Sequence, residues 1–220
     1  MDKTQLTFDE FKHLVSHGSK TVPVYKRILA DLLTPVAAWV HLSKKAEYAF
    51  LLESVEKGNQ YARYSYVGIN PQKILSHKDG QTCITENGKS IEIDKPFLDL
   101  LRETQSQYNM VKLPEIPSFT GGLVGYLGYE TIAWIEDIPT HTDSAMDVPE
   151  AVFVLFVDMI AFDHLKGSAL VISNVKVDSN LDLKVQFDAA HSRIDIIGES
   201  LHSDVDYQTP VRVEKSEVSS

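Results

Sequence analysis

Three tight-turn signals within thirty residues constrain this chain more than any other feature of its sequence. From Tyr64 to Ile93 the chain reads YSYVGI, QKILSH, QTCITE and KSIEI, and these short segments are separated by Asn70-Pro71, Asp79-Gly80 and Asn87-Gly88. Asp-Gly and Asn-Gly favour two-residue hairpin turns, because both central residues of such turns need a positive φ. The pattern therefore predicts an antiparallel meander.

Helices and further strands are predicted on both sides of the meander. Thr7 and Glu10 form a capping box that predicts a helix over residues 8–15, and apolar spacing predicts helices over 97–109 and 183–201. Apolar runs bounded by turn formers predict strands over 48–52, 119–132, 149–164 and 168–177.

The segment VPVYKRILADLLTPVAAWVHL is interpreted as a helix followed by a strand. A short helix is expected over Tyr25–Asp31, a break at Thr34-Pro35, and a strand over Val36–Leu42 that pairs antiparallel with Tyr48–Leu52. With runs of strands and segregated helices, the predicted fold class is α+β: mostly antiparallel, sandwich-like β-sheets with peripheral helices.

Composition excludes several classes of partner. The chain has 220 residues, 43% of them hydrophobic and 24% charged, and a formal net charge of -10 without a block of Lys or Arg. Nucleic acids and anionic membranes require a basic surface, so neither is an expected partner. The longest apolar stretch, Ala151–Phe162, contains Asp158 and is far shorter than the roughly 20 residues of a membrane-spanning helix. Because Cys83 is the single cysteine and no signal sequence is visible, we expect a cytoplasmic protein.

Residues 1–202 are predicted to form one region, and residues 203–220 a linker. The segment after His202 reads SDVDYQTPVRVEKSEVSS, which is polar and poor in large apolar residues. A linker of this kind leads us to expect a further domain in a longer parent protein.

No motif for catalysis or metal binding emerges. Gly121, Gly122, Gly125 and Gly128 fit neither a dinucleotide fingerprint nor a P-loop, so they indicate either close backbone packing or a ligand contact. The histidines lack metal-ligand spacing, and Asp163-His164 suits a solvated hairpin better than a ligand pair. We therefore predict neither catalytic nor metal-binding residues in this segment.

Glu53, Ser54 and Arg63 are the candidate binding residues. The strand ending at Leu52 is followed at once by an acid and a hydroxyl, then by a Lys57-Gly58-Asn59 turn and by Arg63. These three groups are complementary to an amino acid. The acid can bind its ammonium group, the guanidinium can bind its carboxylate, and the hydroxyl can bind either. The alternative is a polar strand end beside a surface ion pair, which the residues alone leave open.

Four ordered elements resemble a known family, the first component of anthranilate synthase (component I). They are PVYKRILADLLTPVAAW with Asp31, Thr34 and Pro35 as its D-x-x-T-P element, YAFLLESVEKGNQYARYSYVG with its LLES and RYS elements, FTGGLVGYLGYE, and LFVDMIAFDH. Together they span residues 21–175, and the resemblance is to the N-terminal region of that family.

The resemblance implies an activity for the complete protein. Members convert chorismate and ammonia, which a glutamine amidotransferase subunit (component II) releases from glutamine, to anthranilate and pyruvate in the first step of tryptophan biosynthesis. They need Mg²⁺ and are feedback-inhibited by L-tryptophan, which binds near the LLES serine. Ser54 and Glu53 then become tryptophan contacts, with Arg63 as a third. The chorismate and Mg²⁺ sites belong to a C-terminal region absent here, so this segment alone is expected to be an inactive part of a lyase.

Three alternatives stay open. The N-terminal region of aminodeoxychorismate (para-aminobenzoate) synthase component I has a similar layout, and the two products differ only through the catalytic region. A free-standing, non-catalytic amino-acid-binding module would use the same three residues. A plain structural domain would use none of them.

Overall fold

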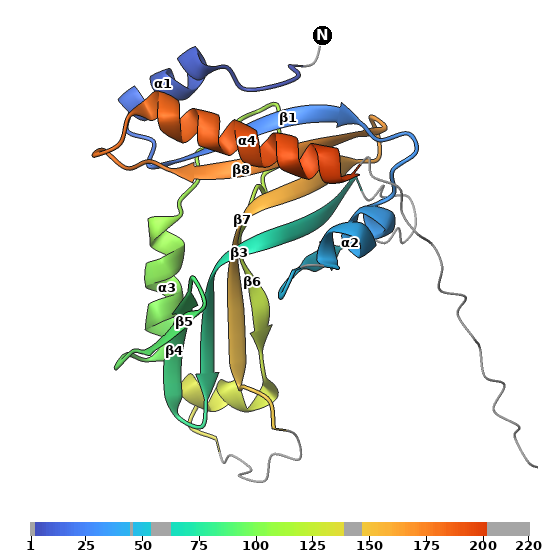
Figure 1. The fold of residues 1–220 in the computed structure, drawn as a ribbon. Coiled ribbons are helices and arrows are strands. Elements are labelled where there is room, and N and C mark those ends of the chain that lie inside the picture. Colours follow the sequence, from blue (N-terminus) through green and yellow to red (C-terminus); the bar gives the residue numbers. More distant parts are fainter. Residues whose placement is uncertain (1–2, 45, 54–62, 139–146, 202–220) are drawn as a thin grey trace, which may run out of the picture.

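The chain folds around one antiparallel sheet. The structure, a computed structural model, describes residues 3–44, 46–53, 63–138 and 147–201 (Figure 1). Its eight strands follow the order β1-β8-β7-β3-β4-β5, with β2 paired to β3 and β6 paired to β7. The strands are β1 Thr21–Leu29, β2 Phe50–Leu52, β3 Tyr64–Lys78, β4 Gln81–Glu86, β5 Lys89–Glu92, β6 Gly122–Leu127, β7 Ala151–Asp163 and β8 Ser168–Lys176.

The long strands β3 and β7 run through both halves of the sheet (Figure 1). Their ladder extends from Tyr64↔Asp163 to His77↔Ala151. Along its other edge, β7 pairs first with β6 and then with β8, whereas β3 pairs first with β2 and then with β4. Every other strand is therefore attached directly or indirectly to this pair.

Within the described ranges, four helices and one 3-10 helix accompany the sheet: α1 Phe8–Ser16, α2 Pro35–Ser43, α3 Phe97–Gln107, η1 Tyr129–Trp134 and α4 Leu183–Leu201. Figure 1 shows α4 lying across β8 and β1, and α3 beside the other half of the sheet. The main core packs Phe187, Ala190 and Ile194 of α4 against the sheet, and a smaller core joins Leu75, Phe97 and Leu100. Among the described residues, no helix is both long and apolar enough to cross a membrane.

A buried polar cluster anchors α4 to the sheet. Ser173 Oγ donates to Asp158 Oδ1 at 2.6 Å, and Arg193 of α4 reaches both, donating from Nε to Asp158 Oδ1 at 3.2 Å and from Nη2 to Ser173 Oγ at 2.7 Å. Asp158 and Ser173 are buried. Because a buried carboxylate needs a partner, Arg193 ties α4 to Asp158 of β7 and to Ser173 of β8.

The predicted fold class and both hairpins are confirmed. Lys78↔Gln81 and Glu86↔Lys89 close two-residue turns, and Asp79, Gly80, Asn87 and Gly88 all have positive φ. The capping box is present, with Thr7 accepting from the Glu10 amide and Glu10 accepting from the Thr7 amide. The helices predicted over 97–109 and 183–201 are observed as α3 and α4.

The interpretation of residues 25–42 was wrong. Residues expected to form a helix over Tyr25–Asp31 lie mainly in β1, which pairs with a strand that begins at Ser168, far along the sequence. Residues expected to form a strand over Val36–Leu42 lie in α2, so the expected pairing with Tyr48–Leu52 is also absent. Thr34 is the N-cap of α2, with Oγ1 accepting from the Ala37 amide at 3.1 Å, and Pro35 starts the helix. The Thr-Pro break was in fact a helix start signal.

A second correction concerns Asn70-Pro71, which does not end a strand. β3 continues through it, with Asn70 at φ 54° and a register shift against β7 between Pro71 and Lys73. Because proline lacks an amide hydrogen, the β3–β7 ladder is interrupted at Pro71, and the strand forms a β-bulge there.

We predict that Thr34→Ala destabilises the chain through the lost cap of α2. The free energy of unfolding should fall by about 0.5–2 kcal/mol, measured by urea denaturation followed by circular dichroism. Thr34→Ser keeps the hydroxyl and should change it by less than about 0.5 kcal/mol. Equal losses in both variants would show that the hydroxyl is not the cause.

Candidate functional site

Glu53 and Arg63 lie at the same end of the β2–β3 ladder. Leu52, the last residue of β2, pairs with Tyr66 near the start of β3. Glu53 directly follows Leu52, and Arg63 directly precedes Tyr64, the first residue of β3. Both are exposed. Ser54 and the predicted Lys57-Gly58-Asn59 turn lie outside the described residues.

Arg63 forms a bidentate ion pair with Asp163 at the end of β7. Nε lies 3.2 Å from Oδ1 and Nη2 lies 2.9 Å from Oδ2. The Arg63 guanidinium also lies over the Tyr64 ring, 4.8 Å from its centroid. Burial alone would raise the pKa of Asp163, but the hydrogen bonds and positive charge of Arg63 outweigh burial and lower it. The pair keeps the carboxylate ionised and holds the guanidinium at the strand end.

Asp163 and His164 lie at the start of the predicted solvated hairpin, which joins β7 to β8 through an exposed turn over residues 164–167, but Asp163 itself is buried. The Asp163 side chain is only 2% exposed. His164 is exposed, and its Nε2 lies 2.8 Å from Ser65 Oγ. Both carboxylate oxygens of Asp163 accept from Arg63. The Ser65–His164 contact joins the start of β3 to the turn that follows β7.

Aromatic side chains line the sheet next to these polar groups. Phe119 meets Tyr66 edge-on with ring centroids 5.2 Å apart, and Phe50 meets Phe156 edge-on at 4.8 Å. Burial raises the pKa of Tyr66, and burial with the nearby Asp163 charge raises that of Tyr64. Both phenols therefore stay neutral at physiological pH and can donate hydrogen bonds.

Arg27 is a further cation on this face of the sheet. Cross-strand partners project from the same face, and Arg27 is joined to Tyr66 and Leu52 through Leu170 and Ala161. Its Nη1 donates to Ser168 Oγ at 3.0 Å and its Nη2 to the Glu115 carbonyl at 3.3 Å. Sequence reasoning missed Arg27, because its place on the same face as Tyr66 depends on the registers of four strands, β1, β8, β7 and β3.

Close packing explains the glycine at two positions of the glycine-rich stretch. A Cβ on Gly125 would lie 1.9 Å from the Val152 carbonyl oxygen of β7, and a Cβ on Gly121 would lie 2.8 Å from the Phe156 carbonyl oxygen. This supports the packing interpretation at Gly121 and Gly125. Likewise, a Cβ on Gly68 would lie 2.0 Å from the Phe50 ring, which covers that glycine from β2.

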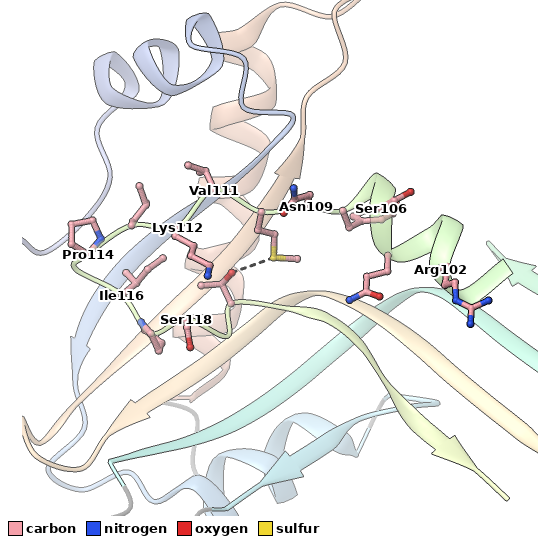
Figure 2. A pocket seen from close by; sticks show the side chains of 14 residues that line it. Arg102, Ser106, Asn109, Val111, Lys112, Pro114, Ile116 and Ser118 are labelled. Carbon is pink, nitrogen blue, oxygen red and sulfur yellow. Dashed lines mark hydrogen bonds between the residues drawn. The ribbon is translucent and has the colours of Figure 1, made fainter. Parts of the chain in front are cut away.

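A pocket of about 680 Å³ lies along the segment that joins α3 to β6 (Figure 2). Arg102 and Lys112 line it together with polar and apolar groups, and no carboxylate does. None of Glu53, Arg63, Asp163 and His164 takes part in its lining. Inside it, Thr120 Oγ1 donates to Met110 Sδ at 3.2 Å. No sequence motif pointed to this pocket, because its wall is an irregular connection.

Several kinds of polar group lie near one end of the β2–β3 ladder. Glu53 and Arg63 flank this end, and Tyr64 and Tyr66 lie at the start of β3, with Tyr66 packed against the Phe119 ring. Within the part of the chain that the structure describes, no three His, Cys, Asp or Glu side chains gather as metal ligands. The described residues therefore do not fit a Mg²⁺ site, which needs converging oxygen ligands.

We predict that Asp163→Asn lowers the free energy of unfolding by about 1–2 kcal/mol at pH 7. This is less than the loss expected for a fully buried charged hydrogen bond, because Arg63 is partly exposed to solvent. The pKa of Asp163 is lower in the folded than in the unfolded chain. Its stabilisation is therefore complete above the unfolded value of about 4 and is lost as the pH falls through the folded value. Urea unfolding at several pH values should show the two proteins converging in acid.

Asp147→Asn is the matched control, since it removes the exposed ion pair with Lys78. We expect no measurable change at neutral pH. A pH-independent gap between Asp163→Asn and the unaltered chain would contradict the assigned role of the Arg63 pair.

Comparison with known proteins gives a consistent result. No family model matches the chain. Anthranilate synthase component 1 of Acetivibrio thermocellus is 32% identical over 177 residues, which cover 80% of this chain and 35% of the relative. The same enzyme component of Acinetobacter calcoaceticus is 33% identical over 213 residues, which cover 93% of this chain and 41% of the relative.

A solved structure supports the fold. The crystal structure of anthranilate synthase component I from Streptococcus pneumoniae TIGR4 matches with a TM-score of 0.52 and 24% identity, over 82% of this chain and 38% of that one. The chain thus spans between about a third and two fifths of the length of these relatives. On the sequence similarities, the chain belongs to the anthranilate synthase component 1 family as a partial-length member.

Proposed function

We propose that this chain is the N-terminal region of an anthranilate synthase component 1, and that it supplies one wall of a feedback site for L-tryptophan. The observation that carries the proposal is the similarity to anthranilate synthase component 1 over most of the chain. In this proposal residues 1–202 form the N-terminal region and residues 203–220 the linker toward a chorismate-binding region.

The complete protein would convert chorismate and ammonia to anthranilate and pyruvate in the cytoplasm. A glutamine amidotransferase subunit, component II, would supply the ammonia. The described residues offer no cluster of metal ligands, so Mg²⁺ and chorismate are assigned to the rest of the protein. This chain alone would then be inactive.

Tryptophan is proposed to bind beside the end of the β2–β3 ladder. Glu53 is the proposed acceptor for the ammonium group, and Ser54, the next residue in the sequence, is the proposed second contact. Arg63, oriented by Asp163 at 2.9 Å, is the proposed contact for the carboxylate. The rings around Tyr66 and Phe119 are the apolar surface nearest to these groups.

Inhibition is proposed to work by linkage between the two regions. Tryptophan that touches both would favour an arrangement in which the catalytic region cannot close on chorismate. Reciprocity then requires chorismate to weaken tryptophan binding by the same factor. No chemistry in this chain is needed for the effect, only a difference in tryptophan affinity between the two arrangements.

We predict that Ser54→Arg in the complete protein relieves tryptophan inhibition. A bulky cation beside the ammonium should raise the half-inhibiting concentration of tryptophan at least tenfold, equivalent to about 1.4 kcal/mol. Turnover without tryptophan should stay within about twofold, because catalysis is placed elsewhere. The measurement is anthranilate fluorescence with chorismate, ammonia and Mg²⁺.

Ser90→Arg is the matched control, because Ser90 is exposed in β5 at the other end of the sheet. It should leave inhibition unchanged. Unchanged inhibition in Ser54→Arg would remove Ser54 from the site. Chromatography of the product decides the enzyme: aminodeoxychorismate in place of anthranilate would replace the proposed activity with that of aminodeoxychorismate synthase.

A further inference from the structure

The pocket of about 680 Å³ beside α3 has a wall of irregular backbone (Figure 2). Residues 109–120 supply most of this wall, and they join α3 to β6 outside any helix or strand. The volume lies within the range of sites that hold small molecules, about 300–1,000 Å³. The pocket is therefore large enough for a ligand, and its lining decides which kind.

The wall is fixed to the sheet, so the pocket is formed before any ligand arrives. The Val111 amide donates to the Thr21 carbonyl of β1 at 3.1 Å. Asn174 of β8 donates from Nδ2 to the Thr120 carbonyl at 2.6 Å. Ile116 and Thr120, which both line the pocket, are buried. A wall held in this way needs little ordering on binding.

Hydrogen-bond donors gather in the wall. The amide groups of Lys112, Leu113, Glu115 and Ser118 make no hydrogen bond to a described residue. Figure 2 places Lys112 and Ser118 near one end of the pocket and Arg102 near the other. Ammonium, hydroxyl and backbone N–H groups all donate to a carboxylate. The end that contains Lys112 and Ser118 is therefore complementary to anionic oxygens.

One positive charge in the lining has no counter-charge. Arg102 and Lys112 are the charged residues that line the pocket, and Arg102 already pairs with Asp99 at 2.9 Å. Within the described ranges, no carboxylate lies within 4 Å of the Lys112 ammonium. Glu115 belongs to the same segment but does not line the pocket. Its charge acts instead on Tyr25 of β1, where it adds to burial in raising the pKa to about 12.

The charges around Tyr108, another lining residue, are of both signs. Lys176 Nζ lies 4.8 Å from the centroid of the Tyr108 ring. Burial and then the negative charge of Glu86 raise the pKa of the Tyr108 phenol. Neither Lys176 nor Glu86 lines the pocket. The uncompensated charge in the lining is thus that of Lys112.

The rest of the lining near Lys112 is largely apolar. Met110, Ile116 and Pro117 contribute to it, and a methionine side chain adapts readily to the shape of an apolar group. One cation matches one negative charge, whereas a phosphate ester carries about 1.5 to 2 at neutral pH. We infer that this pocket binds a small organic monocarboxylate, with its carboxylate at Lys112 and Ser118 and its apolar body against Met110 and Ile116. The inference does not depend on the proposed function.

Titration with benzoate, followed by amide chemical shifts in ¹⁵N-labelled 220-residue chain, tests the inference. Benzoate should cause saturable shifts in the amides of residues 109–118. Benzamide has the same shape without the charge, so it should bind at least about tenfold more weakly. Shifts that do not saturate, or that appear only at the end of the β2–β3 ladder, would overturn the inference. Equal affinities for benzoate and benzamide would also overturn it.

Substitution of the two lining cations locates the carboxylate. Lys112→Met removes the charge from an exposed side chain, so the chain should keep its melting temperature while its dissociation constant for benzoate rises at least about fivefold. Arg102→Met should change that constant by less than about twofold, because Asp99 already neutralises Arg102. The matched control is Lys89→Met on β5, which is exposed and should have no effect. Unaltered benzoate affinity in Lys112→Met would contradict the inference.

L-Tryptophan separates this pocket from the proposed feedback site. No carboxylate lines the pocket to accept an ammonium group, so L-tryptophan should bind there at least about tenfold more weakly than benzoate. Displacement of benzoate by L-tryptophan at equal concentration would identify the pocket as an amino-acid site, and the inference would be wrong. Anthranilate synthesis by the complete protein is measured separately, so failure of the proposed function would leave these results unchanged.

Discussion

The antiparallel pair of β3 and β7 is the constraint on which the rest of the structure depends. Its ladder runs from Tyr64↔Asp163 to His77↔Ala151. Along its outer edge, each of the two strands pairs with two shorter strands, one after the other: β3 with β2 and β4, and β7 with β6 and β8. A one-residue slip in such a pair would move every side chain to the opposite face. The bulge at Pro71 takes up the irregularity locally, so both halves of the sheet keep one buried face in register.

Two acids of β7 show how this pair positions functional groups. Asp158 and Asp163 are five positions apart in β7, an odd spacing, so alternation directs their side chains to opposite faces. Asp158 binds Arg193 of α4 at 3.2 Å and fixes the helix on one face. Asp163 binds Arg63 at 2.9 Å and fixes the strand end beside Glu53. The same strand therefore anchors the core and orients the guanidinium of the proposed tryptophan site.

Local signals in the sequence predicted the parts of the fold that local chemistry determines. Asp79-Gly80 and Asn87-Gly88 specify their hairpins because few other residues tolerate the positive φ of such turns. Tyr25–Leu29 failed as a helix because pairing with β8, far along the chain, overrode local preference. Val36–Leu42 failed as a strand because Thr34-Pro35 was interpreted as a break and not as an N-cap with proline at N1. For the site, sequence reasoning brought Glu53 and Arg63 to one strand end, but it could not see that Asp163 neutralises Arg63 or that Arg27 shares the same face.

The central claim is that this chain holds only one wall of a tryptophan site, and calorimetry tests it most directly. Tryptophan is titrated into the 220-residue chain and into the complete protein under the same conditions. The account predicts saturable binding to the complete protein and no detectable heat with the chain alone. Sub-micromolar binding to the chain alone would contradict it and would identify a self-sufficient amino-acid-binding module.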